Sequence, residues 1–277
     1  DLNDYSIGIE DVLKEHFDEE NIVYWMAFQI LMGNVDTQNR NVYLYSPLNS
    51  DIWYFIAWDN DGCLMRPEYE LRNFSDQNSW EKGISNYWGN ILFQRCLKSR
   101  SFREKLNDAI LDLREYLNKD MLTSKIESYK NVLKPYLYLM PDAEYEPLTS
   151  EQYDQIAASL PDEIEKNYQL YLESLETPMP FYIGVPTIDG DKLKFNWDVS
   201  YDLDAEDITY SVEVAGDYLF RDVIYQNTTL TVPEAEMDLP KAGQYFVRVR
   251  ATNTSGKTQD AFDYYVTDEG KYYGMRC

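Results

Sequence analysis

Four side chains with hard oxygen donors lie close together in the sequence. Asp36 and Asn41 form a D-x-x-x-x-N pattern in GNVDTQNRNVYLY, and Asp59 and Asp61 form D-x-D in WYFIAWDND. Carboxylate and amide oxygens are the ligands that Mg²⁺ or Mn²⁺ prefers, and they suit soft metals poorly. D-x-x-x-x-N alone occurs by chance in acidic chains, and such residues also cap helices or shape turns. The set as a whole, in this order, favours a divalent-metal site.

The elements around these residues are predicted to be a helix, a loop and a hairpin. Asp18 is an expected N-cap for a helix over 19–32, which a Gly-Asn pair ends. The aromatic runs NVYLY and DIWYFIAW, separated by SPLNS, predict a hairpin between about 41 and 58. Asp36 then falls in the loop before the hairpin, and Asp59 directly follows its second strand.

This order of elements matches the needs of phosphoryl transfer. That reaction requires a carboxylate near the attacking hydroxyl and oxygen ligands for Mg²⁺ ions that bridge the nucleotide phosphates. Protein kinases supply them with the Asp and Asn of a D-x-x-x-x-N loop and a second Asp after a short hairpin. The order and spacing of Asp36, Asn41 and Asp59 reproduce that arrangement.

The segments FDEENIVYWMAF, GNVDTQNRNVYLY and WYFIAWDND together resemble the core of the spore-coat protein H (CotH) kinase family. Its members are atypical, secreted or surface-associated relatives of protein kinases, with G-N-x-D after a helix and W-D-x-D after an aromatic-rich strand. The resemblance implies that Asp36 is the catalytic Asp and Asp59 the metal-binding Asp. It implies Asn41 and Asp61 as further metal ligands. The expected activity is transfer of phosphate from ATP, with Mg²⁺ or Mn²⁺, to Ser of surface or spore-coat proteins.

The chain also departs from the family pattern. Members commonly follow W-D-x-D with a small residue and Phe-Gly, whereas this chain continues Gly62, Cys63, Leu64, and Asn60 stands where Leu or Met is usual. Only about 17 residues precede the first expected helix, too few for the β-rich lobe and the phosphate-binding Lys of a kinase. We therefore expect the C-terminal lobe of the kinase domain, which by itself binds ATP poorly and transfers no detectable phosphate.

The length and periodicity predict an α+β chain of two domains, because 277 residues is about twice a typical domain. Residues 1–177 read as a mainly helical, kinase-like C-lobe with a small hairpin. Pro135 is expected to kink or divide one of the helices. The helices expected after the hairpin cover 87–98, 101–118, 121–140 and 149–175, the last with a break near Pro161.

Residues 178–277 are predicted to form an all-β sandwich. The short alternating runs KLKFNW, ITYSVEVA, TLTV and QYFVRVRA are separated by turn residues, as in sandwich domains. This module resembles a fibronectin type III domain, with Trp197 and Tyr210 in the core and Tyr245 leading a late strand. Such modules are spacers or binding surfaces for protein or carbohydrate. The resemblance implies an extracellular or envelope-associated location, the spore surface included.

Composition excludes several other functions. A net charge of −24 argues against nucleic acid as a partner, and no apolar run is long enough for a membrane span. Cys63, Cys96 and Cys277 lack metal-ligand spacing, and the sequence does not decide whether two of them pair. A lone His16 removes most zinc sites and the usual His-based triads.

Two alternatives to a kinase stay open at this point. One is a non-catalytic surface adhesion or ligand-binding protein on a kinase-like scaffold, and the other is a structural module stabilised by Ca²⁺. A further question concerns the aromatic residues Tyr69, Trp80, Tyr87 and Trp88, which could stack on sugars. Core packing is the more common role of large aromatic side chains, and it is the role expected here.

Overall fold

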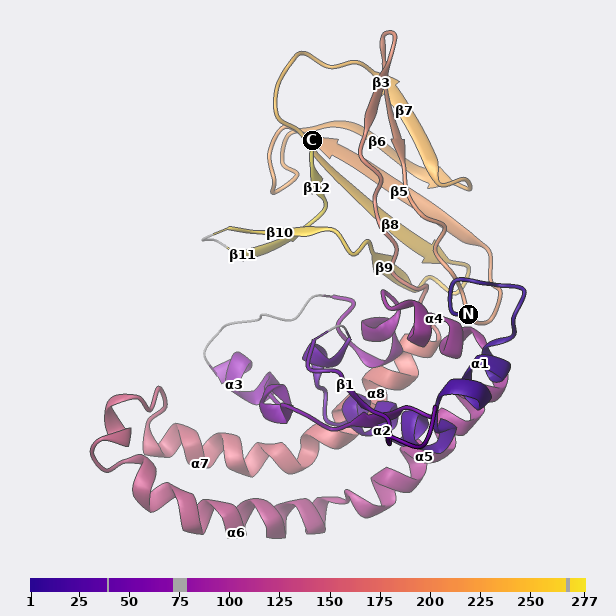
Figure 1. Ribbon diagram of the computed structural model, residues 1–277. Coiled ribbons are helices and arrows are strands. Elements are labelled where there is room, and N and C mark those ends of the chain that lie inside the picture. The colour runs from indigo at the N-terminus through magenta and orange to yellow at the C-terminus, as the bar shows by residue number, and fades with distance from the viewer. Residues whose placement is uncertain (39, 72–78, 268–269) are drawn as a thin grey trace. The chain divides into compact units, whose positions relative to one another are not determined.

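The computed structural model describes residues 1–38, 40–71, 79–267 and 270–277 (Figure 1). Its contacts divide the chain into two compact units. The first comprises Asp1–Gln77 and Asn90–Tyr171, and the second comprises Asn78–Gly89 and Leu172–Cys277. Helices dominate the first unit and strands the second, which confirms the predicted α+β class. The domain boundary expected between residues 177 and 178 stays a prediction.

Among the described residues, the first unit holds a small hairpin among helices, and the last of these helices, α8, runs on past Tyr171 into the second unit. The strands β1 (Tyr43–Tyr45) and β2 (Tyr54–Ile56) pair antiparallel, with Tyr43 opposite Ile56, inside the predicted hairpin region. The helices are α1 (Ile9–His16), α2 (Glu19–Leu31), α3 (Arg66–Leu71), α4 (Ile91–Lys98), α5 (Arg100–Tyr116), α6 (Lys119–Leu137), α7 (Ser150–Ser159) and α8 (Glu163–Leu175), and the short 3₁₀ helices are η1 (Val35–Thr37), η2 (Asn60–Gly62), η4 (Asp142–Glu144) and η5 (Leu160–Asp162).

Helix α2 forms the core of this unit. The Asp18 carboxylate accepts a hydrogen bond from the backbone N–H of Asn21 at 2.8 Å, so the expected N-cap is present. Ile22, Met26 and Leu31 are completely buried. Burial of each such side chain stabilises the fold by about 1.5–3 kcal/mol. α2 packs against α5, whose buried stripe consists of Phe102, Leu106, Ala109 and Ile110.

The structure differs from two of the helix predictions. The helix expected over 87–98 begins only at Ile91, because 83–87 forms the 3₁₀ helix η3 (Gly83–Tyr87). α6 runs to Leu137 with Pro135 inside it, so the proline does not divide the helix. Pro135 lies in the last turn, where it removes one hydrogen bond near the helix end. The expected break near Pro161 is present as η5.

The second unit is built from antiparallel strands in two main sheets. One has the order β12-β8-β5-β6 with β9 on β8, and the other has the order β3-β4-β7; β10 and β11 form a separate hairpin. The strands are β3 (Thr187–Asp189), β4 (Lys192–Asn196), β5 (Ile208–Ala215), β6 (Val223–Leu230), β7 (Glu234–Asp238), β8 (Phe246–Asn253), β9 (Thr258–Asp260), β10 (Tyr264–Thr267), β11 (Gly270–Tyr273) and β12 (Met275–Arg276).

One hydrophobic cluster joins the two sheets. It contains Phe195 of β4, Val212 of β5 and Val249 of β8, so side chains of both sheets share a core, as in a sandwich. Trp197 and Tyr210 belong to this cluster, with ring centroids 5.5 Å apart. Their predicted core positions are confirmed. The sequence reading missed most of β6 and all of β7, because these strands are largely exposed and rich in polar residues.

The aromatic residues that could have formed a sugar platform are packed inside. In the second unit Trp80, Tyr87 and Trp88 are each at most 5% exposed. Trp80 contacts Phe262 with ring centroids 5.1 Å apart, and Trp88 lies 5.5 Å from Tyr201. The expectation of core packing is confirmed for these three residues.

Two further findings bear on chemistry and location. Cys63, Cys96 and Cys277 are all free thiols. In the part of the chain that the structure describes, no helix has the length and apolar character needed to cross a bilayer.

Candidate active site

The end of α2 sets the direction of the loop that carries Asp36. Gly33 has a left-handed backbone, with φ of +61°, which disfavours residues with a side chain. A Cβ at Gly33 would also lie 2.7 Å from Nδ2 of Asn167, closer than atoms pack. Glycine is therefore required here on two independent grounds, and this explains the glycine of the G-N-x-D motif.

Asn34 organises the turn that follows. Its side-chain Oδ1 accepts from the backbone N–H of Asp36 at 3.2 Å, and its backbone oxygen accepts from Oγ1 of Thr37 at 3.2 Å. These bonds cap η1 and hold Asp36 at its first turn. Asp36 itself is exposed, so its carboxylate is accessible to a ligand.

The hairpin positions the other two carboxylates, those of Asp59 and Asp61. Asn21 of α2 clamps the middle of β2, because its amide donates to the oxygen of Phe55 at 3.1 Å and accepts from the N–H of Phe55 at 2.6 Å. The rings of Tyr43 and Trp58 lie 4.8 Å apart at the end of the hairpin. Asp59 follows with φ of +51° and starts η2, which contains Asp61.

A buried amide network joins the two loops. Asn34, only 2% exposed, donates from Nδ2 to Oε1 of Gln29 at 3.0 Å and to Oδ1 of Asn60 at 3.2 Å. The backbone N–H of Leu64 donates to the oxygen of Met32 at 2.9 Å. Asn60, at the position where the family has Leu or Met, thus takes part in the link between the loop of Asp36 and the W-D-x-D loop.

The carboxylates on the two loops interact electrostatically. The charge of Asp61 is the largest cause that raises the pKa of Asp59 above its ordinary value, followed by burial, a hydrogen bond with Asp61 and the charge of Asp36. Gly62 brings its backbone close as well, since a Cβ there would lie 3.8 Å from Oδ2 of Asp36. The loop of Asp36 and the loop that carries Asp59 and Asp61 are therefore neighbours in the structure.

Asn41 lies at the start of the hairpin. It directly precedes the hairpin in a left-handed backbone, with φ of +50°, and is partly buried. Within the described residues, no hydrogen bond connects its amide to the three carboxylates. Because Tyr43 pairs with Ile56, Asn41 before the first strand and Asp59 after the second strand both flank the open end of the same hairpin.

The donor set fits a hard divalent cation. Carboxylates whose mutual repulsion raises a pKa are stabilised in the ionised form by a bound cation. However, the oxygen atoms of Asp36, Asp59 and Asp61 do not all lie within 4.8 Å of one another when one oxygen is taken from each carboxylate. Among the described residues, only the ligand atoms of Asp1, Glu15 and His16 lie that close together. These three residues lie close together because His16 forms an exposed ion pair with Asp1 at 2.8 Å.

Cys63, beside this site, is not a nucleophile. Burial, with the charge of Asp61 as the second cause, raises the pKa of its thiol to about 12. The thiol therefore stays protonated at neutral pH, and the thiolate is the reactive form. The chemistry that the site offers is that of oxygen ligands and a carboxylate base.

The sequence did not predict a polar cluster that supports the end of α2, just before the loop of Asp36. Arg66 donates to Oδ1 of Asn167 at 2.6 Å and pairs with Glu163 at 3.1 Å. Asn167 also donates to the backbone oxygen of Leu31 at 2.8 Å and so caps α2. Glu163 and Asn167 of α8 are buried at i and i+4, and polar residues at that spacing in an otherwise apolar helix stripe are the signal that could have revealed them.

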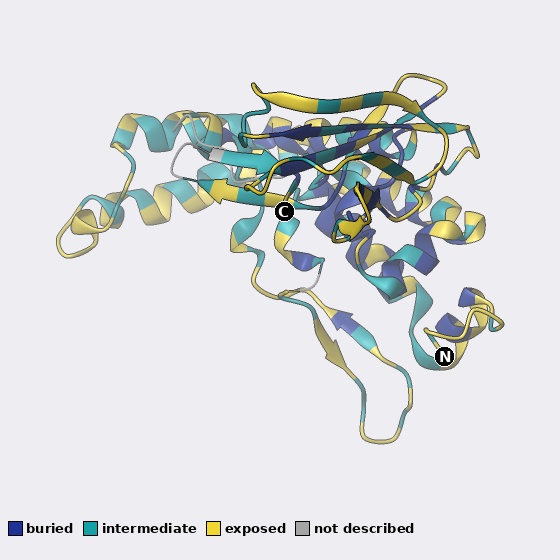
Figure 2. Cartoon of the chain, turned by 90° about the horizontal axis from the view of Figure 1, so that it is seen from above, coloured by how far each residue is buried: buried dark blue, intermediate teal, exposed yellow. Residues whose placement is uncertain are grey.

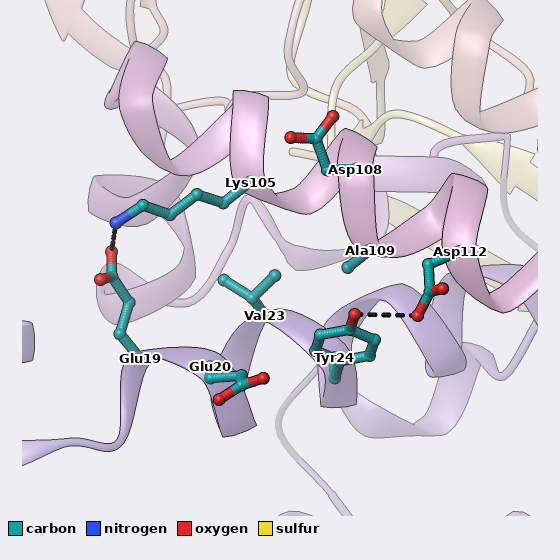
Figure 3. Close-up of a pocket in the computed structure, with 8 residues that line it drawn as sticks. All are labelled: Glu19, Glu20, Val23, Tyr24, Lys105, Asp108, Ala109 and Asp112. Atoms are coloured by element: carbon teal, nitrogen blue, oxygen red, sulfur yellow. Dashed lines mark hydrogen bonds and ion pairs between the residues drawn. The ribbon is translucent and has the colours of Figure 1, made fainter.

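A pocket lies elsewhere in the first unit. It has a volume of about 540 Å³ and is formed between α2 and α5 (Figure 3). Two polar contacts occupy its lining: Lys105 pairs with Glu19 at 2.6 Å, and Tyr24 donates to Asp112 at 2.9 Å. Glu20 and Asp108 also line this pocket, and none of its lining residues belongs to the G-N-x-D or W-D-x-D motif.

Comparison with known proteins agrees with the sequence resemblance. Residues 2–171 match the family model described as CotH kinase protein. The matched range includes every residue of the carboxylate site and the supporting cluster on α8. No curated protein matches the chain.

Proposed function

Because the chain belongs to the CotH kinase family, we propose that Asp36, Asp59 and Asp61 form the centre of a kinase-type phosphotransferase. The observation that carries this proposal is the pair of Asn34 hydrogen bonds that join the loop of Asp36 to the loop of Asp59 and Asp61, and the charges of Asp61 and Asp36 both raise the pKa of Asp59. Protein kinases need one carboxylate at the substrate hydroxyl and others on the metal, and this set has carboxylates on two loops joined by Asn34.

The residues take distinct roles in this proposal. Asp36 orients the attacking hydroxyl and accepts its proton, for which an exposed carboxylate on a capped turn is suited. Asp59 holds Mg²⁺ or Mn²⁺, with Asp61 and Asn41 as further ligands. The metal ion, when bound, neutralises the charge that develops on the phosphates during transfer. Asn34 keeps the two loops in register.

The substrates in this proposal are those that the family resemblance implies. We propose ATP as phosphate donor and Ser of surface or spore-coat proteins as acceptor. The surface charge supports a protein acceptor over a nucleic acid, because a net charge of −24 repels phosphate polymers. An extracellular or envelope-associated location is part of the same proposal.

We also propose that the β-sandwich is of the fibronectin type III kind and binds protein or carbohydrate outside the cell. Its sheets of three and five strands support this, and so does a hydrogen bond from Oη of Tyr245 to the backbone oxygen of Lys241 at 2.8 Å. A tyrosine that bonds back to the chain just upstream of a late strand is a known feature of immunoglobulin-like sandwiches.

A second candidate function has one observation in its favour. Tyr43, Tyr45 and Trp58 of the hairpin region are 50–54% exposed, and exposed aromatic rings suit a non-catalytic surface-binding protein. The carboxylate site has no role in that alternative, so substitution of its residues separates the two.

The test is phosphate transfer by the complete protein. We expect Asp36→Asn to lower the rate by roughly 10²–10⁴-fold, the usual contribution of a catalytic acid or base. Asp59→Asn should also lower the rate, because it removes a ligand of the metal ion. Asp51→Asn is the matched control, since Asp51 is exposed in the turn of the same hairpin. Unchanged rates in both site variants, with the fold intact, would reject the assignment and favour the binding protein.

A further inference from the structure

One face of α6 is apolar and exposed. Tyr129, Val132, Leu133 and Tyr136 follow the i, i+3, i+4, i+7 spacing of a single helix face. We call these four residues the α6 stripe. Each is between 51 and 66% exposed, and the next two apolar residues, at 139 and 140, are exposed as well. No residue of α6 is buried, and Figure 2 shows the helices at the left, where Figure 1 labels α6 and α7, mostly in teal and yellow.

The other side of α6 already has partners. Lys134 pairs with Asp154 of α7 at 2.5 Å, and Lys130 lies 3.8 Å from the same carboxylate. Beyond the helix end, Tyr138 meets Tyr153 edge to face at 6.5 Å. These contacts fix α6 against α7 and leave the α6 stripe free for another surface. An exposed apolar face of this size is typical of an interaction site.

The charges around the stripe are unusual for this protein. The chain has 49 acidic residues, yet in the described structure none of them lies on the α6 stripe side of the helix by helical spacing. Lys125, one turn before Tyr129, is the charged residue on that side. Glu127 points toward α7, since it accepts from Lys130 at 2.7 Å. A basic partner would therefore find carboxylates only beyond the end of α6 and none along the α6 stripe itself.

We propose that the α6 stripe is a self-association surface on which a second copy of this chain packs antiparallel, related by a two-fold axis. An axis between Val132 and Leu133 places Tyr129 of one copy near Tyr136 of the other. It brings Lys125 to the end of the helix pair where Asp142 of the second copy lies, with Glu144 beside it. The stripe is thus complementary to itself in shape and charge, as a two-fold interface requires.

The area is sufficient for a reversible dimer. Side chains with these exposed fractions, together with Leu139 and Met140, expose on the order of 700 Å² per copy in total. The part that faces the second copy is smaller than the ~800 Å² per partner of a standard interface, which fits a weak dimer. The net charge of −24 on each copy opposes association. Because salt screens this repulsion, the dimer should become tighter as ionic strength rises.

The experiment is sedimentation velocity on the full chain over a range of concentrations up to about 100 μM. We expect a dimer that dissociates on dilution. Val132→Glu places a charge next to the same charge of the second copy, close to the two-fold axis. The substitution should weaken association at least tenfold. Asn131→Glu is the matched control, since it adds the same charge at the next exposed position, off the stripe. Both sites are exposed, so both variants should fold and melt as the parent does.

A charge exchange tests the antiparallel geometry separately. Lys125→Glu should weaken the dimer, and Lys125→Glu combined with Asp142→Lys and Glu144→Lys should restore it. A chain that is monomeric throughout the range overturns the proposal. So does a dimer that Val132→Glu leaves unchanged, or one that Asn131→Glu weakens to the same extent. Failure of the charge exchange to restore association rejects the antiparallel arrangement.

Discussion

At the scale of single residues, Asp59 is the most informative group in the molecule. The charge of Asp61, then burial, a hydrogen bond and the charge of Asp36 raise its pKa. The folded chain therefore binds this proton more tightly than the unfolded chain does. That contribution favours folding below the ordinary pKa of an Asp and is lost as pH rises through the raised value.

We predict that Asp61→Asn lowers the pKa of Asp59 toward its ordinary value, because it removes the largest cause of the shift. Carboxyl-carbon NMR titration of Asp59 measures this directly. The variant should also melt at a higher temperature than the parent at pH 7 without metal, and the difference should vanish when both carboxylates are protonated. A pKa that does not move would show that Asp59 and Asp61 are not coupled.

Asn34 is the residue on which the geometry of the site depends most. Replacement by Ala leaves the amide of Asp36 and the side-chain oxygens of Gln29 and Asn60 without their present partners. We predict a loss of about 1–3 kcal/mol in the free energy of unfolding, the usual cost of unpaired buried polar groups. Urea denaturation measures it, with the exposed Asn131→Ala as control. Equal stability of the two variants would contradict this role.

At the scale of elements, α8 supports the end of α2. A double-mutant cycle tests the contact between Gly33 and Asn167, where a new Cβ would lie 2.7 Å from Nδ2. Gly33→Ala should destabilise by more than the ~1 kcal/mol of a left-handed alanine, because of the added clash. Combined with Asn167→Ala, it should cost less than the sum of the two single changes. If the effects of the two substitutions on the free energy of unfolding are strictly additive, the contact contributes nothing to stability.

The elements themselves were largely predictable, and their tertiary contacts were not. Asp18, the Gly-Asn stop and the aromatic runs are local signals, so α2 and the hairpin were predicted close to their observed bounds. The carboxylates could be named because a motif specifies their spacing. The cluster of Arg66, Glu163 and Asn167 could not, since it joins residues about a hundred positions apart by hydrogen bonds that no local pattern encodes.

At the scale of the whole molecule, the net charge of −24 opposes compactness. Ion pairs such as those of Arg100 with Glu104 and Lys119 with Asp162 are exposed, and such pairs contribute little. Salt that screens these charges should therefore weaken the repulsion between acidic residues more than it weakens the attraction within ion pairs. We predict that the melting temperature rises with NaCl at a concentration where the chain is monomeric. A melting temperature that falls with salt would show that specific ion pairs dominate instead.

Divalent-ion binding by the chain itself tests the central assignment most directly. Calorimetric titration with Mn²⁺ is best done on a His16→Gln background, which removes the second group of ligand atoms near the N-terminus. We predict saturable binding that Asp59→Asn abolishes and that Asp51→Asn, in the turn of the same hairpin, leaves intact. If the Asp59→Asn chain binds Mn²⁺ as tightly as its parent, the metal is not held by these carboxylates, and the proposed phosphotransferase centre is wrong.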